Sequence, residues 1–125
     1  MQTHGINVGL TRLNKSYFLN MQIIGKLTHD DYQETMPLIE SFIKDISDTK
    51  VNVFVDITQL EGWELQAAWD DLKFGLKHSR DFGKIAVLGR TNMQAWMTKI
   101  GNWFTFAKIE YFEDKEEALR WLELK

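Results

Sequence analysis

The residues of this chain that could carry out acid–base chemistry are few and widely separated. Asp56 lies near the end of the apolar run VNVFVDI, and open α/β sheets bind ligands at the carboxyl ends of their strands. Asp70 and Asp71 are adjacent, so on a helix their side chains point about 100° apart and do not form a working pair by themselves. With His78 they would form a catalytic group only if the fold gathered them at one end of a sheet. A hydrogen bond between Asp56 and Thr58 in a turn is the simpler interpretation, and we expect no enzyme.

Metal, cofactor and nucleophile motifs are missing from the sequence. The histidines His4, His29 and His78 lie far apart, and the chain has no cysteine. We find no P-loop, no nucleophile elbow and no glycine-rich dinucleotide turn. We therefore predict neither a transition-metal site nor a cofactor.

One short segment has the composition of an anion site. Arg90, Thr91 and Asn92 follow the apolar run IAVL and Gly89, and they precede a stretch with helical periodicity. Backbone N–H groups at the start of a helix, together with an arginine, can hold an anion. A plain turn with Asn92 as the helix cap explains the same residues, and we prefer that interpretation.

Aromatic and basic residues are concentrated between residues 63 and 104. If residues 63–79 are helical, Trp63 and Phe74 lie opposite the face that carries the leucines, and a second helix over about 92–104 carries Trp96 and Trp103 on one flank. A helix covering one sheet face needs one apolar stripe, so a second stripe indicates a ligand, a partner subunit or a membrane, unless these aromatics are core. The predicted ligand- or membrane-binding set is Trp63, Phe74, Trp96, Trp103, Phe104, Lys73, Lys77 and Lys99.

Charge is distributed unevenly along the chain. Residues 73–108 contain seven basic residues and one acid, whereas the remainder carries a net charge of −9. This asymmetry predicts a basic and an acidic face, the alternative being charge scattered over the surface. A basic, aromatic segment suits an anionic lipid surface, while the overall charge of −3 makes nucleic acid an unlikely partner.

The elements that must position these residues alternate between strand and helix. Strands are predicted over 6–13, 16–26, 51–57, 85–88 and 107–112. Helices are predicted after Thr28, over 63–79, over 92–104 and after Asp114, with Pro37 interrupting the first. The order β-β-α-β-α-β-α-β-α predicts an α/β domain spanning residues 1–125, with a mixed, mostly parallel sheet and an antiparallel edge. Without a signal peptide or a long apolar run, we expect a cytoplasmic protein.

The segment VFVDITQLEGWELQAAWDDLKFGLKHSRDFGKIAVLG, the helical stretch MQAWMTKIGNWF and the pair Tyr111-Phe112 resemble the SpoIIAA-like proteins, which are related to STAS domains. The resemblance covers essentially the whole chain and implies a STAS-type sheet flanked by helices. Anti-sigma-factor antagonists of this type are switched by phosphorylation of a serine at the start of the helix after the central strand. Glu61-Gly62-Trp63 occupies that place here, so we do not transfer the switch.

The function hypothesis that follows is a non-enzymatic binding module. Its ligand would be a small apolar or amphipathic molecule or a lipid, with peripheral association to an anionic membrane through helices 63–79 and 92–104. The alternative is a protein-interaction or dimerisation domain of STAS type without a phosphoswitch, in which a homodimer covers the same apolar stripe.

Overall fold

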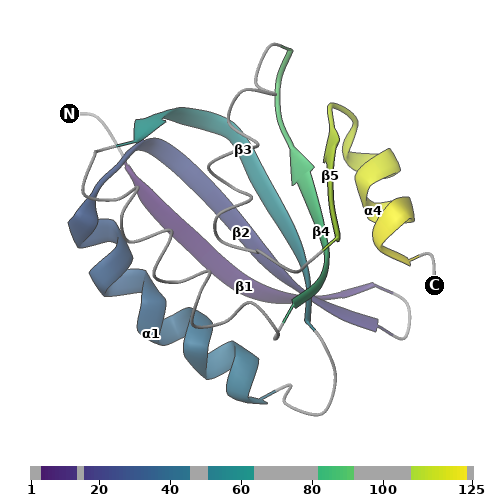
Figure 1. Cartoon of the computed structure of the whole chain (residues 1–125), viewed down its shortest axis with the longest axis horizontal. Helices are drawn as coiled ribbons and strands as arrows, with labels where there is room; N and C mark the ends of the chain where they lie inside the picture. Colours follow the sequence, from purple (N-terminus) through teal and green to yellow (C-terminus); the bar gives the residue numbers. More distant parts are fainter. Residues whose placement is uncertain (1–3, 14–15, 46–50, 64–81, 92–107, 124–125) are drawn as a thin grey trace.

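The computed structural model describes residues 4–13, 16–45, 51–63, 82–91 and 108–123, which form a sheet with one helix on each face (Figure 1). The strands lie in the order β1-β2-β3-β4-β5. β1 pairs with β2 in the antiparallel sense, and β2–β3, β3–β4 and β4–β5 are parallel. The elements are β1 (Gly5–Leu13), β2 (Ser16–Leu27), α1 (His29–Asp45), β3 (Val51–Trp63), β4 (Phe82–Leu88), β5 (Lys108–Phe112) and α4 (Lys115–Glu123). This confirms the predicted, mostly parallel sheet with an antiparallel edge. Except for Trp63, the predicted helices over 63–79 and 92–104 lie outside the described residues.

One face of the sheet packs against α1. Alternate residues of a strand point to the same face, and accordingly Leu19, Met21 and Ile23 of β2 are all buried in the larger core cluster. Ile39 of α1 belongs to the same cluster and is fully buried. The β-branched residues of β3 and β4 on this face complete it: Val51, Val53, Val55, Ile57, Ile85 and Val87.

The first turn of α1 is held by a reciprocal capping box. The Asp31 N–H donates to Thr28 Oγ1 at 3.3 Å, and the Thr28 N–H donates to Asp31 Oδ2 at 2.9 Å. The predicted cap is therefore confirmed. The predicted interruption at Pro37 is wrong, because α1 runs without a break from His29 to Asp45. Pro37 is exposed, so the carbonyl that loses its helical partner lies on the solvent side of the helix.

The opposite face of the sheet packs against α4, and a smaller core cluster fills the space between them. Phe18, Phe54, Ala86 and Leu88 contribute from the strands, and Ala118 and Leu122 from α4. The Glu116 N–H donates to Asp114 Oδ1 at 3.2 Å, which confirms the predicted cap at Asp114. Neither described helix combines the length and the apolar composition that crossing a membrane requires.

β3 is longer than predicted. The alternation of apolar residues places its end at Ile57, but the strand continues to Trp63, so the expected helix start at Trp63 is wrong. The pairing with β2 shows why: Gln22 pairs with Asp56, and Ile24 pairs with Gln59, so β3 contains one extra residue. Such a bulge shifts the side-chain alternation by one, which allows Ile57 and Leu60 to be buried in the same cluster. A second register shift follows between Gly25 and Lys26.

Candidate functional site

β4 and β5 end side by side at the carboxyl edge of the sheet, level with Asp56 in the longer strand β3. Asp56 of β3 pairs with Leu88 of β4, and Leu88 pairs with Phe112 of β5. The predicted anion segment begins immediately after Leu88. This edge is where open α/β sheets place their ligands, so its polar groups are the first candidates for a functional site.

The carboxylate at this edge has an internal role. Asp56 Oδ1 accepts hydrogen bonds from the Thr58 N–H at 2.8 Å and from the Thr58 hydroxyl at 2.7 Å. These bonds confirm the expected hydrogen bond between Asp56 and Thr58, but the two residues lie at the bulge within β3 and not in a turn. The other proposed members of an acid–base group, Asp70, Asp71 and His78, lie outside the described residues.

Arg90 connects the turn after β4 with β3 and β5. Its Nε donates a hydrogen bond to the Thr58 carbonyl, and its own carbonyl accepts one from the Tyr111 hydroxyl. One residue earlier, the Gly89 N–H donates to the Phe112 carbonyl at 2.9 Å. The turn after β4 is thus tied to β3 on one side and to β5 on the other, while Arg90 and Thr91 remain exposed.

Gly89 makes room for the tyrosine in this arrangement. A Cβ atom at position 89 would lie 2.7 Å from Cε2 and from the hydroxyl oxygen of Tyr111, which is closer than carbon atoms approach each other. Gly89 is buried, and no side chain fits between its backbone and the ring. The glycine therefore allows Tyr111 to reach the carbonyl of Arg90.

The chemistry available at this edge is electrostatic. An arginine side chain has five N–H donors in a planar fork and matches carboxylate or phosphate groups. Arg90 presents its fork on a turn whose backbone is held by hydrogen bonds.

The other predicted site residues have different outcomes. Trp63 is the last residue of β3 and does not lie on a helix, because the bulges extend the strand. Arg90 and Thr91 follow β4, and Arg90 contacts Thr58 of β3, while anion binding by these residues stays a prediction. The remaining predicted residues lie outside the described part of the chain: Phe74, Trp96, Trp103, Phe104, Lys73, Lys77, Lys99 and Asn92.

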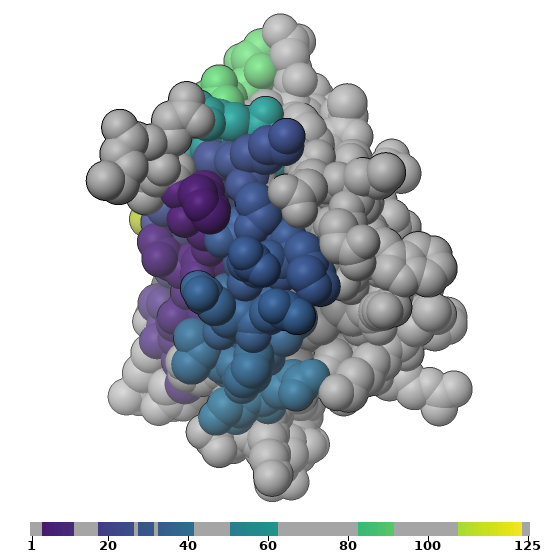
Figure 2. All heavy atoms as spheres, turned by 90° about the vertical axis from the view of Figure 1, so that its left-hand side faces the viewer, coloured from purple at the N-terminus to yellow at the C-terminus, as the bar shows by residue number. Residues whose placement is uncertain are grey.

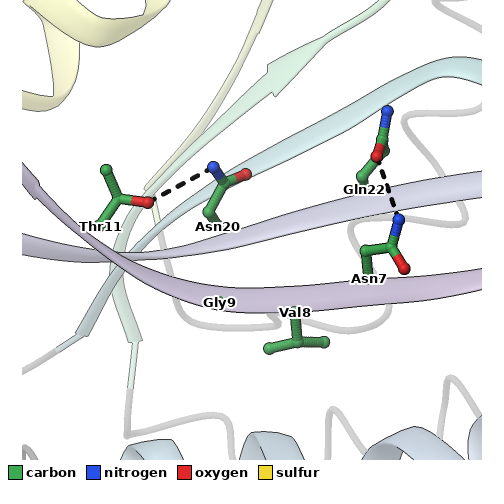
Figure 3. Close-up of a pocket in the computed structure, with 6 residues that line it drawn as sticks. All are labelled: Asn7, Val8, Gly9, Thr11, Asn20 and Gln22. Carbon is green, nitrogen blue, oxygen red and sulfur yellow. Dashed lines mark hydrogen bonds between the residues drawn. The ribbon is translucent and has the colours of Figure 1, made fainter.

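Sequence reasoning missed a polar hollow on the exposed face of the β1–β2 hairpin, on the side of the sheet that carries α4. It has a volume of about 230 Å³ and lies over Gly9 (Figure 3). Asn7 Nδ2 donates to Gln22 Oε1 at 3.2 Å, and Asn20 Nδ2 donates to Thr11 Oγ1 at 3.5 Å. Figure 3 shows these four side chains on one side of the hairpin and Val8 pointing to the other. The polar residues at alternate positions of residues 7–11 were the signal in the sequence.

A second missed contact lies at the start of α1. His4 Nδ1 is 3.0 Å from both carboxylate oxygens of Asp31, whose side chain is 8% exposed. The same carboxylate caps the helix. The contact fastens the chain in front of β1 to the first turn of α1.

Comparison with known proteins identifies the fold and the family. The SpoIIAA-like family model matches residues 18–123. The structure is similar to that of an uncharacterized protein with a SpoIIAA-like fold from Shewanella loihica, with 43% identity, a TM-score of 0.86, and coverage of 98% of this chain and 97% of that one. It also resembles an anti-sigma factor antagonist from Mycobacterium paratuberculosis in fold, with 14% identity, a TM-score of 0.52 and 96% coverage of both chains. No curated protein matches the sequence. On the family match and the 43% identity, this chain belongs to the SpoIIAA-like family.

Proposed function

We propose that this protein is a non-catalytic binding domain that recognises an acidic surface of a partner protein through the turn around Arg90. The observation that carries the proposal is the bracing of this turn. Arg90 is exposed, yet its backbone carbonyl and its Nε are both engaged, by Tyr111 and Thr58 respectively. A binding group held in place before its partner arrives loses less conformational freedom on binding.

The chemistry of the edge supports binding in preference to catalysis. Asp56 is the carboxylate nearest to Arg90 in the strand register, and one of its oxygens already accepts two hydrogen bonds from Thr58. A general base must reach the proton that it removes, and this oxygen is engaged in holding the bulge.

The fold supports a protein as the partner. The structurally similar chain from Mycobacterium paratuberculosis is an anti-sigma factor antagonist, a name that describes action on another protein. Glu61-Gly62-Trp63 lies within β3 and contains no hydroxyl group. We therefore propose partner binding that does not depend on phosphorylation at this place.

Site-specific photocrosslinking tests the proposal. A photoreactive amino acid at Thr91, introduced into the full-length protein in the cells that produce it, is expected to give discrete cross-linked products. Arg90→Ala should abolish them, because it removes the guanidinium and leaves the backbone bonds of Gly89 and Arg90 in place. The same amino acid at Glu117, exposed on α4, serves as the matched control. Equal products from both positions, or products that persist without Arg90, would contradict the proposal.

A second candidate function is binding of an amphipathic, negatively charged ligand such as a lipid. The specific observation in its favour is in the sequence: the seven basic residues between 73 and 108 include Arg90 and accompany Phe74, Trp96, Trp103 and Phe104. Juxtamembrane basic residues contribute about 1 kcal/mol each near an anionic surface.

Vesicle sedimentation distinguishes the two candidates. The lipid candidate predicts that the protein sediments with phosphatidylglycerol vesicles but not with phosphatidylcholine vesicles, with a blue shift of tryptophan fluorescence. Added salt should release it, because exposed charges are screened within about 10 Å at ordinary ionic strength. Failure to sediment at low salt excludes the membrane and leaves the crosslinking result unaffected.

A further inference from the structure

The two edges of the sheet are built differently. β5 is five residues long and carries exposed Lys108 and Glu110. β1 is nine residues long, and residues 5–11 of it contain no charged residue. Proteins ordinarily protect an exposed strand edge by keeping it short or by placing charge on it, because unpaired backbone groups otherwise recruit another strand. β5 has both protections, whereas β1 is longer and carries its one charged residue, Arg12, next to its last position.

Gly9, at the centre of β1, has no function in the packing of its own chain. A Cβ atom built on Gly9 meets nothing within 4 Å, and its φ angle is not among the positive ones. Glycine inside a strand weakens it, and often marks a place where another backbone approaches closely. Gly9 also lines the polar hollow, between Asn7 and Thr11 of the same strand (Figure 3).

Two exposed apolar side chains accompany this edge. Among the described residues, the exposed large hydrophobic side chains are Leu10 of β1, 43% exposed, and Leu38 of α1, 55% exposed. α1 packs against β1, and Figure 2 shows the two elements side by side on one surface of the molecule. An apolar side chain thus lies on the edge strand itself and another on the helix beside it.

From these observations we propose that β1 pairs in the antiparallel sense with β1 of a second copy of this chain, around a two-fold axis at Gly9. This pairing sets Asn7 opposite the second copy's Thr11 and Val8 opposite its Leu10. Both pairs match in polarity, and they lie on opposite faces of the joined sheet. The two polar hollows adjoin at the axis.

We propose a second copy in preference to a strand of another protein because β1 meets the special requirement of a two-fold contact. Any charge at the axis of such a contact occurs twice. The residue on a two-fold axis faces its own copy, so a charge at that position is repelled by the same charge in the second copy. The uncharged residues 6–10 of β1 satisfy this requirement. This inference goes beyond the proposed function, since it concerns the edge strand β1 and not the turn around Arg90.

Sedimentation equilibrium with charge variants at Gly9 tests the inference. The wild-type protein is expected to be a dimer at micromolar concentration. Gly9→Lys and Gly9→Glu should each raise the dimer dissociation constant by about 100-fold or more, because like charges then meet at the axis. An equimolar mixture of the two variants should associate again. Glu110→Lys, on the other edge, is the matched control and should remain dimeric. The open space at Gly9 means that neither variant disturbs the fold, which circular dichroism checks.

Disulfide trapping gives an independent measurement of the register. The chain has no cysteine, so Gly9→Cys introduces a single thiol. Across the proposed axis the two Cα atoms would be about 4.5–5.5 Å apart, within the range that a disulfide spans. We expect rapid oxidation to a covalent dimer, and no comparable reaction for Glu110→Cys. A monomeric wild-type protein, a dimer insensitive to charge at Gly9, or a dimer that Gly9→Cys fails to trap would each overturn the inference.

Discussion

Arg90 and Thr58 are 32 residues apart in the sequence, yet the Nε of one donates a hydrogen bond to the carbonyl of the other. The contact connects the bulge of β3 with the turn after β4. The same turn is bound to β5 through Tyr111, so hydrogen bonds from this one turn reach both neighbouring strands. A rigid scaffold that presents an exposed turn is the usual arrangement of a binding site.

Gly89→Ala should destabilise the protein by about 1–3 kcal/mol, because the added methyl group would overlap the ring of Tyr111 and overpacking has costs of this size. The free energy of unfolding from urea titration measures the effect. Tyr111→Leu combined with Gly89→Ala should recover part of the loss, since the double variant removes the group that clashes. A stability change for Gly89→Ala within experimental error would contradict the close approach.

Asp56→Ala should lower the free energy of unfolding by about 1–3 kcal/mol, because the Thr58 N–H and hydroxyl then lose a charged acceptor. Thr58→Val keeps the β-branched shape and the N–H, and removes only the hydroxyl bond. Its cost should be about 0.5–1.5 kcal/mol. If the two variants were equally destabilised, the backbone bond to Asp56 would contribute nothing, contrary to the structure.

The sequence predicted the strands well where the pattern of apolar residues depends only on which faces of the strand are buried. VNVFVDI is nearly continuous in apolar character because both faces of β3 are buried, with Val53 and Val55 against α1 and Phe54 against α4. Apolar and polar residues alternate in Ser16–Leu27 because the other face of β2 lines the polar hollow at Asn20 and Gln22. The end of β3 was missed because a bulge shifts the alternation, and no local residue preference announces one.

The candidate site was predictable only in part. Arg90 and Thr91 were found because a turn after a buried strand is a local signal. Thr58 and Tyr111, which hold Arg90, come from other strands, and only the sheet register brings them together. The residues next to Gly9 in the sequence do not mark it either, since what distinguishes Gly9 is the empty space where its Cβ atom would lie.

Thr28→Ala should destabilise α1 and lower the free energy of unfolding by about 0.5–2 kcal/mol, because it removes the acceptor for the Asp31 N–H. Asp31→Ala should cost more, since this side chain both caps the helix and contacts His4. Asp30→Ala is the matched control: Asp30 is exposed in the same turn, and its loss should change stability by only about 0.3–1 kcal/mol through the helix dipole. The order of the three values, obtained from urea titration, is the critical result, and an Asp30 effect equal to that of Asp31 would contradict the capping box.

Leu60→Ala tests whether β3 continues beyond Ile57. Leu60 is 2% exposed and belongs to the α1-side cluster, so its truncation should cost about 2–5 kcal/mol. Its neighbour Gln59 is exposed, and Gln59→Ala should change stability by no more than about 0.5 kcal/mol. A strand that ended at Ile57 would leave Leu60 in a turn, where truncation has little cost. The strict alternation without a bulge would instead place Leu60 on the face opposite Ile57. Only the bulged strand places Leu60 beside Ile57 in one core, so a double-mutant cycle between Leu60→Ala and Ile57→Val should show coupling of at least about 0.5 kcal/mol.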